Sequence, residues 1–83
     1  MFELRWSPET RARLRQFVEA AADPGAVIAA VQGLDRLLRD DPAGHSESRP
    51  DAERIAFARP LGVRFRVEGQ YVVIGAVWRI RPT

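Results

Sequence analysis

Arginine side chains in the last part of the sequence are the groups best suited to bind a ligand. Residues 49–83 hold seven arginines and three acids, a balance of +4, whereas residues 1–48 hold six arginines and eight acids, a balance of −2. A guanidinium group binds a phosphate or a carboxylate through two parallel hydrogen bonds. This region is therefore expected to attract either a phosphate backbone or an acidic protein partner.

Other reactive side chains are scarce. The sequence has no cysteine and a single histidine, His45, which removes disulfides, thiolate chemistry and the usual nitrogen and sulfur ligands of zinc. His45 stands in a stretch rich in glycine and serine, so we expect a solvated loop side chain. All 13 basic residues are arginine, which is always charged and cannot easily act as a general base at neutral pH. We therefore expect no metal and no other cofactor.

Two consecutive strands are predicted to carry the positive charge. In the first, Val63, Phe65 and Val67 alternate with charged residues, as in a strand with one buried face. The run from Tyr71 to Ile80 is apolar on both alternating sets, which predicts a strand covered on both faces near the centre of a sheet. Trp6 and Trp78 are expected to be core aromatics, and Tyr71 to pack beside the turn.

Two helices are predicted to support this sheet. Ser7 and Pro8 form a cap and first-turn signal for a helix that ends near Ala22. Asp23 and Pro24 repeat the signal for a second helix that runs through Arg39. Gly33 lies inside this second helix at a cost of about 1 kcal/mol relative to alanine, and we expect close packing on the neighbouring helix to explain it.

The remaining elements complete a small α+β domain. Residues 2–6 alternate as a short strand, residues 45–51 read as a loop, and residues 52–59 predict a strand at the edge of the sheet. The order β-α-α-β-β-β predicts two layers, with a helical hairpin packed on one face of a small, largely antiparallel sheet. Residues 1–83 are expected to form a single domain, and no window is apolar enough for a membrane span or signal peptide, which favours the cytoplasm.

This order and several local strings resemble the RelE/ParE superfamily of toxins from type II toxin–antitoxin systems. The first strand ends in Trp6-Ser7-Pro8, like the entry of that family into its first helix. Residues 33–42 (GLDRLLRDDP) are similar to its second helix, and residues 72–79 (VVIGAVWR) to its final strand. Residues 47–49 (ESR), Arg54 and residues 60–65 (PLGVRF) resemble a branch labelled plasmid-stabilisation-like.

The resemblance implies a cognate antitoxin as partner, and RNA binding with cleavage of messenger RNA on the ribosome, or inhibition of DNA gyrase, as activity. RNA cleavage needs a proton acceptor, a proton donor and cations that stabilise charge on phosphorus. By resemblance, the candidate cations of a metal-independent endoribonuclease are the following arginines: Arg54, Arg64, Arg66, Arg79 and Arg81. The sequence departs from the RNA-cleaving pattern because it has no lysine and no tyrosine or histidine after Trp78. A non-catalytic member that only binds a partner is therefore a further alternative.

Overall fold

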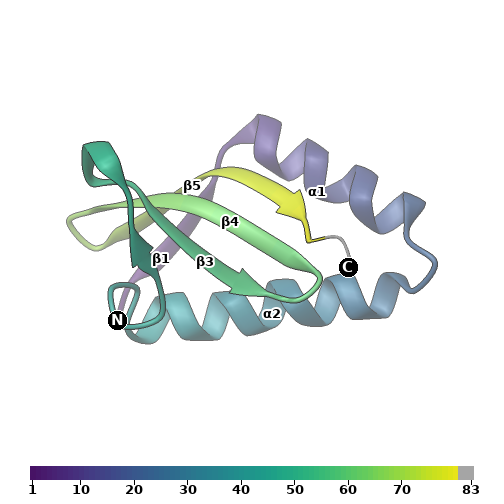
Figure 1. Ribbon diagram of the computed structural model, residues 1–83, viewed down its shortest axis with the longest axis horizontal. Helices are drawn as coiled ribbons and strands as arrows, with labels where there is room; N and C mark the ends of the chain where they lie inside the picture. The colour runs from purple at the N-terminus through teal and green to yellow at the C-terminus, as the bar shows by residue number, and fades with distance from the viewer. Residues whose placement is uncertain (81–83) are drawn as a thin grey trace.

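The chain folds as two helices packed against a five-stranded sheet, which confirms the predicted α+β class. In the computed structural model, which describes residues 1–80, the elements are β1 (Glu3–Trp6), α1 (Pro8–Ala20), α2 (Pro24–Asp40), β2 (Glu47–Ser48), the short 3₁₀ turn η1 (Pro50–Ala52), β3 (Arg54–Ala58), β4 (Leu61–Glu68) and β5 (Tyr71–Arg79) (Figure 1). Apart from the two-residue β2, which lies in the segment predicted as a loop, the order is the predicted one.

Both helices begin at the predicted caps. The Ser7 side chain accepts a hydrogen bond from the Thr10 amide at 3.2 Å, and Asp23 accepts one from the Ala26 amide at 3.2 Å. Each cap is followed by a proline, whose missing N–H is not needed in a first turn. Within residues 1–80, neither helix is long and apolar enough to cross a membrane.

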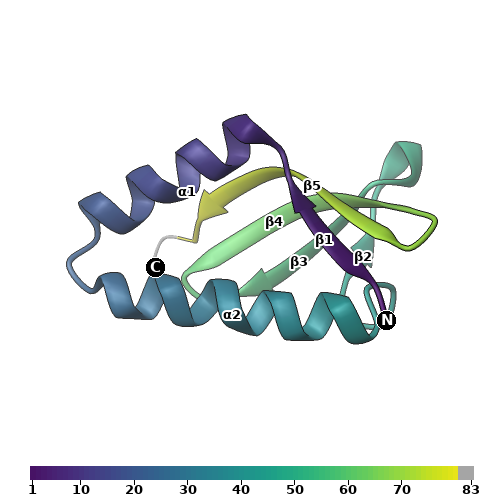
Figure 2. The same ribbon diagram turned by 180° about the vertical axis from the view of Figure 1, so that it is seen from behind.

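The sheet has the strand order β1-β5-β4-β3-β2, in which β1 runs parallel to β5 and all other neighbours are antiparallel (Figure 2). β5 thus lies inside the sheet, as predicted, although β4 is its middle strand. Because β1 and β5 are the first and last elements, their parallel pairing places the first and last strands of the described chain side by side.

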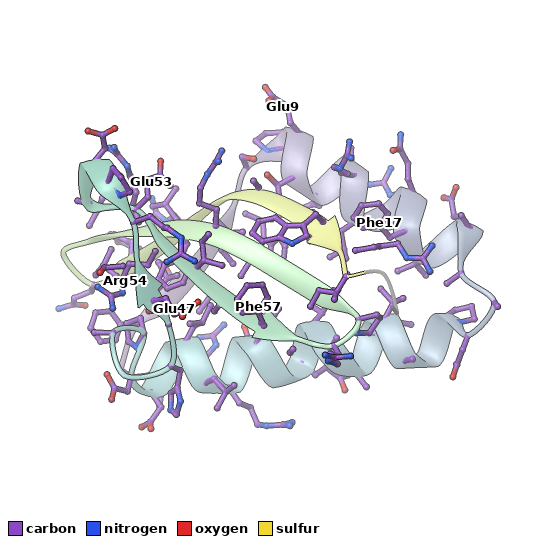
Figure 3. All side chains as sticks on the ribbon, viewed as in Figure 1. Glu9, Phe17, Glu47, Glu53, Arg54 and Phe57 are labelled. Carbon is purple, nitrogen blue, oxygen red and sulfur yellow. The ribbon has the colours of Figure 1, made fainter. Side chains whose placement is uncertain are left out.

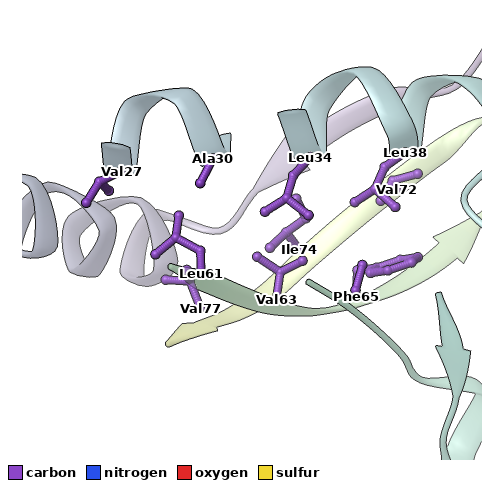
Figure 4. Packing of buried hydrophobic residues seen from close by; sticks show 11 residues of the cluster. Val27, Ala30, Leu34, Leu38, Leu61, Val63, Phe65, Val72, Ile74 and Val77 are labelled. Atoms are coloured by element: carbon purple, nitrogen blue, oxygen red, sulfur yellow. The ribbon is translucent and has the colours of Figure 1, made fainter. Parts of the chain in front are cut away.

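The core lies between α2 and the inner face of the sheet. The side chains of Leu34 and Leu38 are fully buried, as is Phe65 on β4 (Figure 4). Leu14, Phe17 and Val18 of α1 pack against the same cluster. The other buried apolar residues are Val27, Ala30, Ala56, Leu61, Val63, Val72, Ile74 and Val77.

The prediction that β5 is covered on both faces is wrong, since only one of its faces is fully buried. Val72, Ile74 and Val77 are buried, whereas Tyr71 is 37% exposed. A bulge at Gly75 explains the uneven spacing: Arg64 pairs with Ala76 and the next residue, Phe65, pairs with Ile74. Because of the extra residue, the side chain of Val77 points to the core. The apolar run of β5 therefore has one buried face and one face that is partly exposed to solvent.

Close helix packing at Gly33 is also a wrong prediction. Apart from its chain neighbours and the backbone of its own helix, a Cβ atom built at this position would meet no heavy atom within 4 Å. Gly33 therefore has space for a methyl group, and nothing in the structure requires a glycine there.

Candidate functional site

The outer face of the sheet, opposite the helices, gathers charged and aromatic side chains. Paired residues on adjacent strands share a face, so the register assigns each strand's contribution. Arg64 and Phe57 point outward, whereas Val63 and Ala56, next to them in sequence, are buried. We call this surface the outer face; its members are Glu3, Arg5, Glu47, Ile55, Phe57, Gly62, Arg64, Arg66, Glu68, Tyr71, Val73, Ala76 and Trp78.

At one end of the outer face, two arginines converge on one carboxylate. Arg64 Nε lies 3.4 Å from Glu53 Oε2, and Arg66 Nε lies 3.6 Å from Glu53 Oε1. Arg66 Nη2 also donates a hydrogen bond to the carbonyl of Asp51 at 3.0 Å. Both arginine side chains remain about half exposed, at 53% and 50%, so each ion pair contributes at most about 1 kcal/mol. Their guanidinium groups are thus positioned and still accessible to a ligand.

The chemistry of this cluster combines anion binding with proton acceptance. Arg64 and Arg66 can hold a phosphate or a carboxylate, and the Glu53 carboxylate can accept a proton from a group bound beside them. Glu53 is 28% exposed and immediately precedes β3 (Figure 3). Sequence reasoning missed Glu53, although it shares the alternation of Ile55 and Phe57 that places them on one face.

A cation–π contact lies on the β1 side of the same face. The Arg5 guanidinium carbon lies 3.7 Å from the centroid of the Tyr71 ring, and Arg5 Nε lies 3.8 Å from Glu3 Oε2. The ring of Tyr71 therefore serves as a platform for Arg5, and it stays more exposed than a packed core residue.

Aromatic side chains form the other end of the outer face. Phe57 and Trp78 meet edge to face with ring centroids 6.2 Å apart, and Phe57 is 48% exposed. The Trp78 ring covers Gly62, where an added Cβ would lie only 2.6 Å from Trp78 Cε2. Trp78 is therefore not a core aromatic as predicted, while Trp6 packs against the core. An open hollow of about 600 Å³ beside this pair is lined by Phe57, Arg59, Trp78, Arg79 and Ile80.

The predicted arginines do not form a single site. Arg54 lies on the helix side of β3, where Nε donates to Ser46 Oγ at 2.6 Å and Nη2 to the carbonyls of Ala43 and Ser46 at 3.2 and 3.3 Å. This side chain holds the loop before β2. Arg79 pairs with the buried Leu61 at the far end of the sheet, and Arg81 lies outside the described residues. Of the four predicted arginines within residues 1–80, only Arg64 and Arg66 come together.

Comparisons with known proteins identify the fold. No protein-family model matches the chain, and no curated protein is significantly similar. Among solved structures, the chain is similar to a chain of the toxin–antitoxin complex RelBE2 from Mycobacterium tuberculosis, with a TM-score of 0.76 and 20% identity over 96% of this chain and 98% of that one. A chain of the chromosomal ParDE TA system from P. aeruginosa matches with a TM-score of 0.65 and 22% identity over 98% of each chain. These similarities confirm the fold that the RelE/ParE resemblance implies.

Proposed function

We propose that this chain is the toxin-like component of a type II toxin–antitoxin module and that its outer face binds a cognate antitoxin. The main support is the fold shared with chains of two toxin–antitoxin complexes, together with a solvated sheet face that carries arginines at one end and an aromatic pair at the other. Exposed aromatic and arginine side chains are the groups that dominate protein interfaces.

The two ends of the outer face suit different parts of an acidic partner. An apolar side chain fits the hollow beside Phe57 and Trp78. Acidic side chains of the partner replace Glu53 at Arg64 and Arg66, an exchange that costs little because the existing ion pairs are half exposed. Binding then combines apolar burial with charge complementarity.

Co-expression with the small open reading frame adjacent to this gene tests the proposal. We expect the two products to co-purify, and F57A to weaken their affinity by at least about tenfold, as for an interface hot spot. The matched control is I28A on α2, where an apolar side chain is 47% exposed away from the outer face. Absence of a complex, or equal affinities of F57A and I28A, would count against the proposal.

Metal-independent RNA cleavage is a second candidate, favoured by the position of Glu53 between two arginines. In this reaction the Glu53 carboxylate accepts the proton of a ribose 2′-hydroxyl, whose oxygen attacks the adjacent phosphorus. The bond from phosphorus to the 5′-oxygen breaks, that oxygen takes a proton from solvent, and a 2′,3′-cyclic phosphate remains. Arg64 and Arg66 stabilise the negative charge that develops on the phosphoryl oxygens.

The isosteric substitution E53Q separates cleavage from binding. If Glu53 is the base, E53Q lowers the cleavage rate of messenger RNA, with and without ribosomes, by about 100-fold or more while partner affinity is retained. The assay without ribosomes contains a chelator so that no metal contributes. Equal cleavage by the wild type and E53Q would exclude this role, and DNA breaks without RNA cleavage would favour gyrase as the target.

A further inference from the structure

A short turn before β3 places a carboxylate of the chain itself on the arginine pair of the outer face. Residues 49–53 form this turn, which contains η1 and projects from one end of the sheet (Figure 1). Its last residue, Glu53, offers one carboxylate oxygen to Arg64 and the other to Arg66, at 3.4 and 3.6 Å. The two guanidinium groups therefore share a ligand that belongs to their own chain.

Backbone contacts complete a closed state of the 49–53 turn. Arg66 Nη2 donates a hydrogen bond to the carbonyl of Asp51 at 3.0 Å, so one arginine holds both the backbone of the turn and the Glu53 side chain. The Arg49 amide donates to the carbonyl of Glu53 at 2.7 Å, and the Glu53 amide donates to the carbonyl of Pro50 at 3.3 Å. These contacts keep the Glu53 carboxylate over the arginines.

The closed turn contains two consecutive residues with strained backbone. The φ angle is +63° at Asp51 and +61° at Ala52, in the left-handed region that residues other than glycine rarely adopt. Aspartate tolerates this region because its short polar side chain can form local hydrogen bonds, whereas alanine has no such compensation. Strain of this kind persists only where surrounding contacts maintain it. The backbone of the turn therefore opposes the closed state.

The contacts that maintain the closed state are exposed to solvent. The side chain of Glu53 is 28% exposed, and those of Arg64 and Arg66 are about half exposed. Ion pairs in such surroundings are weak and are screened by salt. Asp51 and Ala52 are exposed as well, so no core contact fixes the turn. It can open while β3 and β4 stay paired, and a small change in its contacts shifts the balance between the two states.

We propose that the 49–53 turn is a plug, which keeps the Arg64–Arg66 pair closed to anions until Glu53 moves aside. The strained backbone lowers the free energy needed to open it. The site takes an oxyanion, a carboxylate or a phosphate, because each guanidinium already faces one oxygen of a carboxylate. The displaced Glu53 remains tethered beside the bound anion, where it can still accept a proton. This inference concerns access to the outer face, and it rests on the function proposed above for the use of that face.

Inorganic pyrophosphate is a probe that tests anion binding without a protein or RNA partner. In NMR titrations of the full chain, the side-chain Nε–H signals of Arg64 and Arg66 are expected to shift saturably, with a Kd on the order of 1 mM. If about one molecule in ten is open, closure weakens the apparent affinity about tenfold. Variants that open the plug can therefore bind pyrophosphate up to about tenfold more tightly.

The charge of the plug is tested by E53Q with E68Q as its control. E53Q removes the carboxylate from the arginines and should strengthen pyrophosphate binding by about three- to tenfold. Glu68 lies on the same outer face, at an exposed position of β4, and forms no ion pair within residues 1–80. E68Q thus measures the gain from the loss of any negative charge on this face, and we expect it to be less than about twofold.

The backbone of the plug is tested by two substitutions at Ala52 with opposite expected effects. Proline cannot adopt a positive φ, so A52P opens the turn and strengthens pyrophosphate binding by about threefold or more, although Glu53 is intact. Glycine adopts this φ without strain, so A52G favours the closed turn and weakens binding by about two- to threefold. Thermal unfolding confirms that each variant is folded.

Three results would overturn the proposal. They are the absence of saturable shifts of Arg64 and Arg66 in every variant, equal gains in affinity from E53Q and E68Q, and binding by A52P no tighter than by A52G. Failure of the function proposed above has a separate sign, the absence of a complex with the product of the adjacent gene. The pyrophosphate affinities do not depend on that complex.

Discussion

The two faces of the sheet are formed by the same strands, but their side chains differ in burial. On β4, Phe65 is 1% exposed against α2, while its neighbours Arg64 and Arg66 are about half exposed on the outer face. On β3, Ala56 is buried and Phe57 is 48% exposed. The inner face thus determines stability, and the outer face is free to carry arginines and aromatic rings whose burial the fold does not require.

The largest expected effect comes from comparing the same substitution, phenylalanine to alanine, on the two faces. F65A leaves a cavity in the core and is expected to lower the free energy of unfolding by about 3–5 kcal/mol. F57A removes a half-exposed ring and should cost about 1 kcal/mol or less. Urea unfolding measures the free energy of unfolding of both variants. Similar losses of stability in F65A and F57A would mean that Phe57 on the outer face stabilises the fold as much as the core does.

Gly62 is a close-packed position on the outer face, because the Trp78 ring covers it. G62A would place Cβ 2.6 Å from Trp78 Cε2 and should lower stability by about 1–3 kcal/mol as the ring is displaced. G75A is the matched control in the next strand, since a Cβ there meets nothing within 4 Å. Thermal unfolding with tryptophan fluorescence follows both effects, and unchanged stability together with unchanged tryptophan emission in G62A would refute the packing.

Two arginines on opposite faces provide a smaller contrast. R54A removes three hydrogen bonds to the loop before β2 and is expected to cost about 1–2 kcal/mol. R64A removes one exposed ion pair and should change the free energy of unfolding by less than about 0.5 kcal/mol. If R64A proves as destabilising as R54A, the arginines of the outer face are structural as well.

The smallest predicted effect is a gain in stability at Gly33. G33A replaces a helix-interior glycine at a position with space for a methyl group, so we expect stabilisation by about 1 kcal/mol. The midpoint of urea unfolding measures it. Destabilisation by G33A would instead support the prediction from the sequence that Gly33 allows close packing on the neighbouring helix.

Local signals predicted the fold well because they act over a few residues. Ser7 and Asp23 cap their helices within three residues, and each precedes a proline, so both helix starts could be read from the sequence. The charged and apolar alternation around Phe65 likewise specified which face of β4 is buried. These features, with the strand order along the chain, were sufficient for the α+β class.

The site depended on contacts between distant segments, which the sequence does not display. Arg54 looked like a ligand-binding residue until the loop at Ala43 and Ser46 was placed beside it. Glu53 joins Arg64 only through the β3–β4 register. For β5, an apolar run looks the same in the sequence whether its second face is buried or carries a half-buried Trp78. The bulge at Gly75, which changes the face on which the following residues lie, cannot be seen in the sequence.

The most direct test of the outer face as the functional surface is growth after induction of the chain. We expect the wild type to arrest growth unless the adjacent gene is co-expressed. The double variant R64A/R66A should be folded and harmless, and R11A/R15A, on the exposed surface of α1, should arrest growth like the wild type. Arrest of equal depth by R64A/R66A and the wild type would contradict the role of this face.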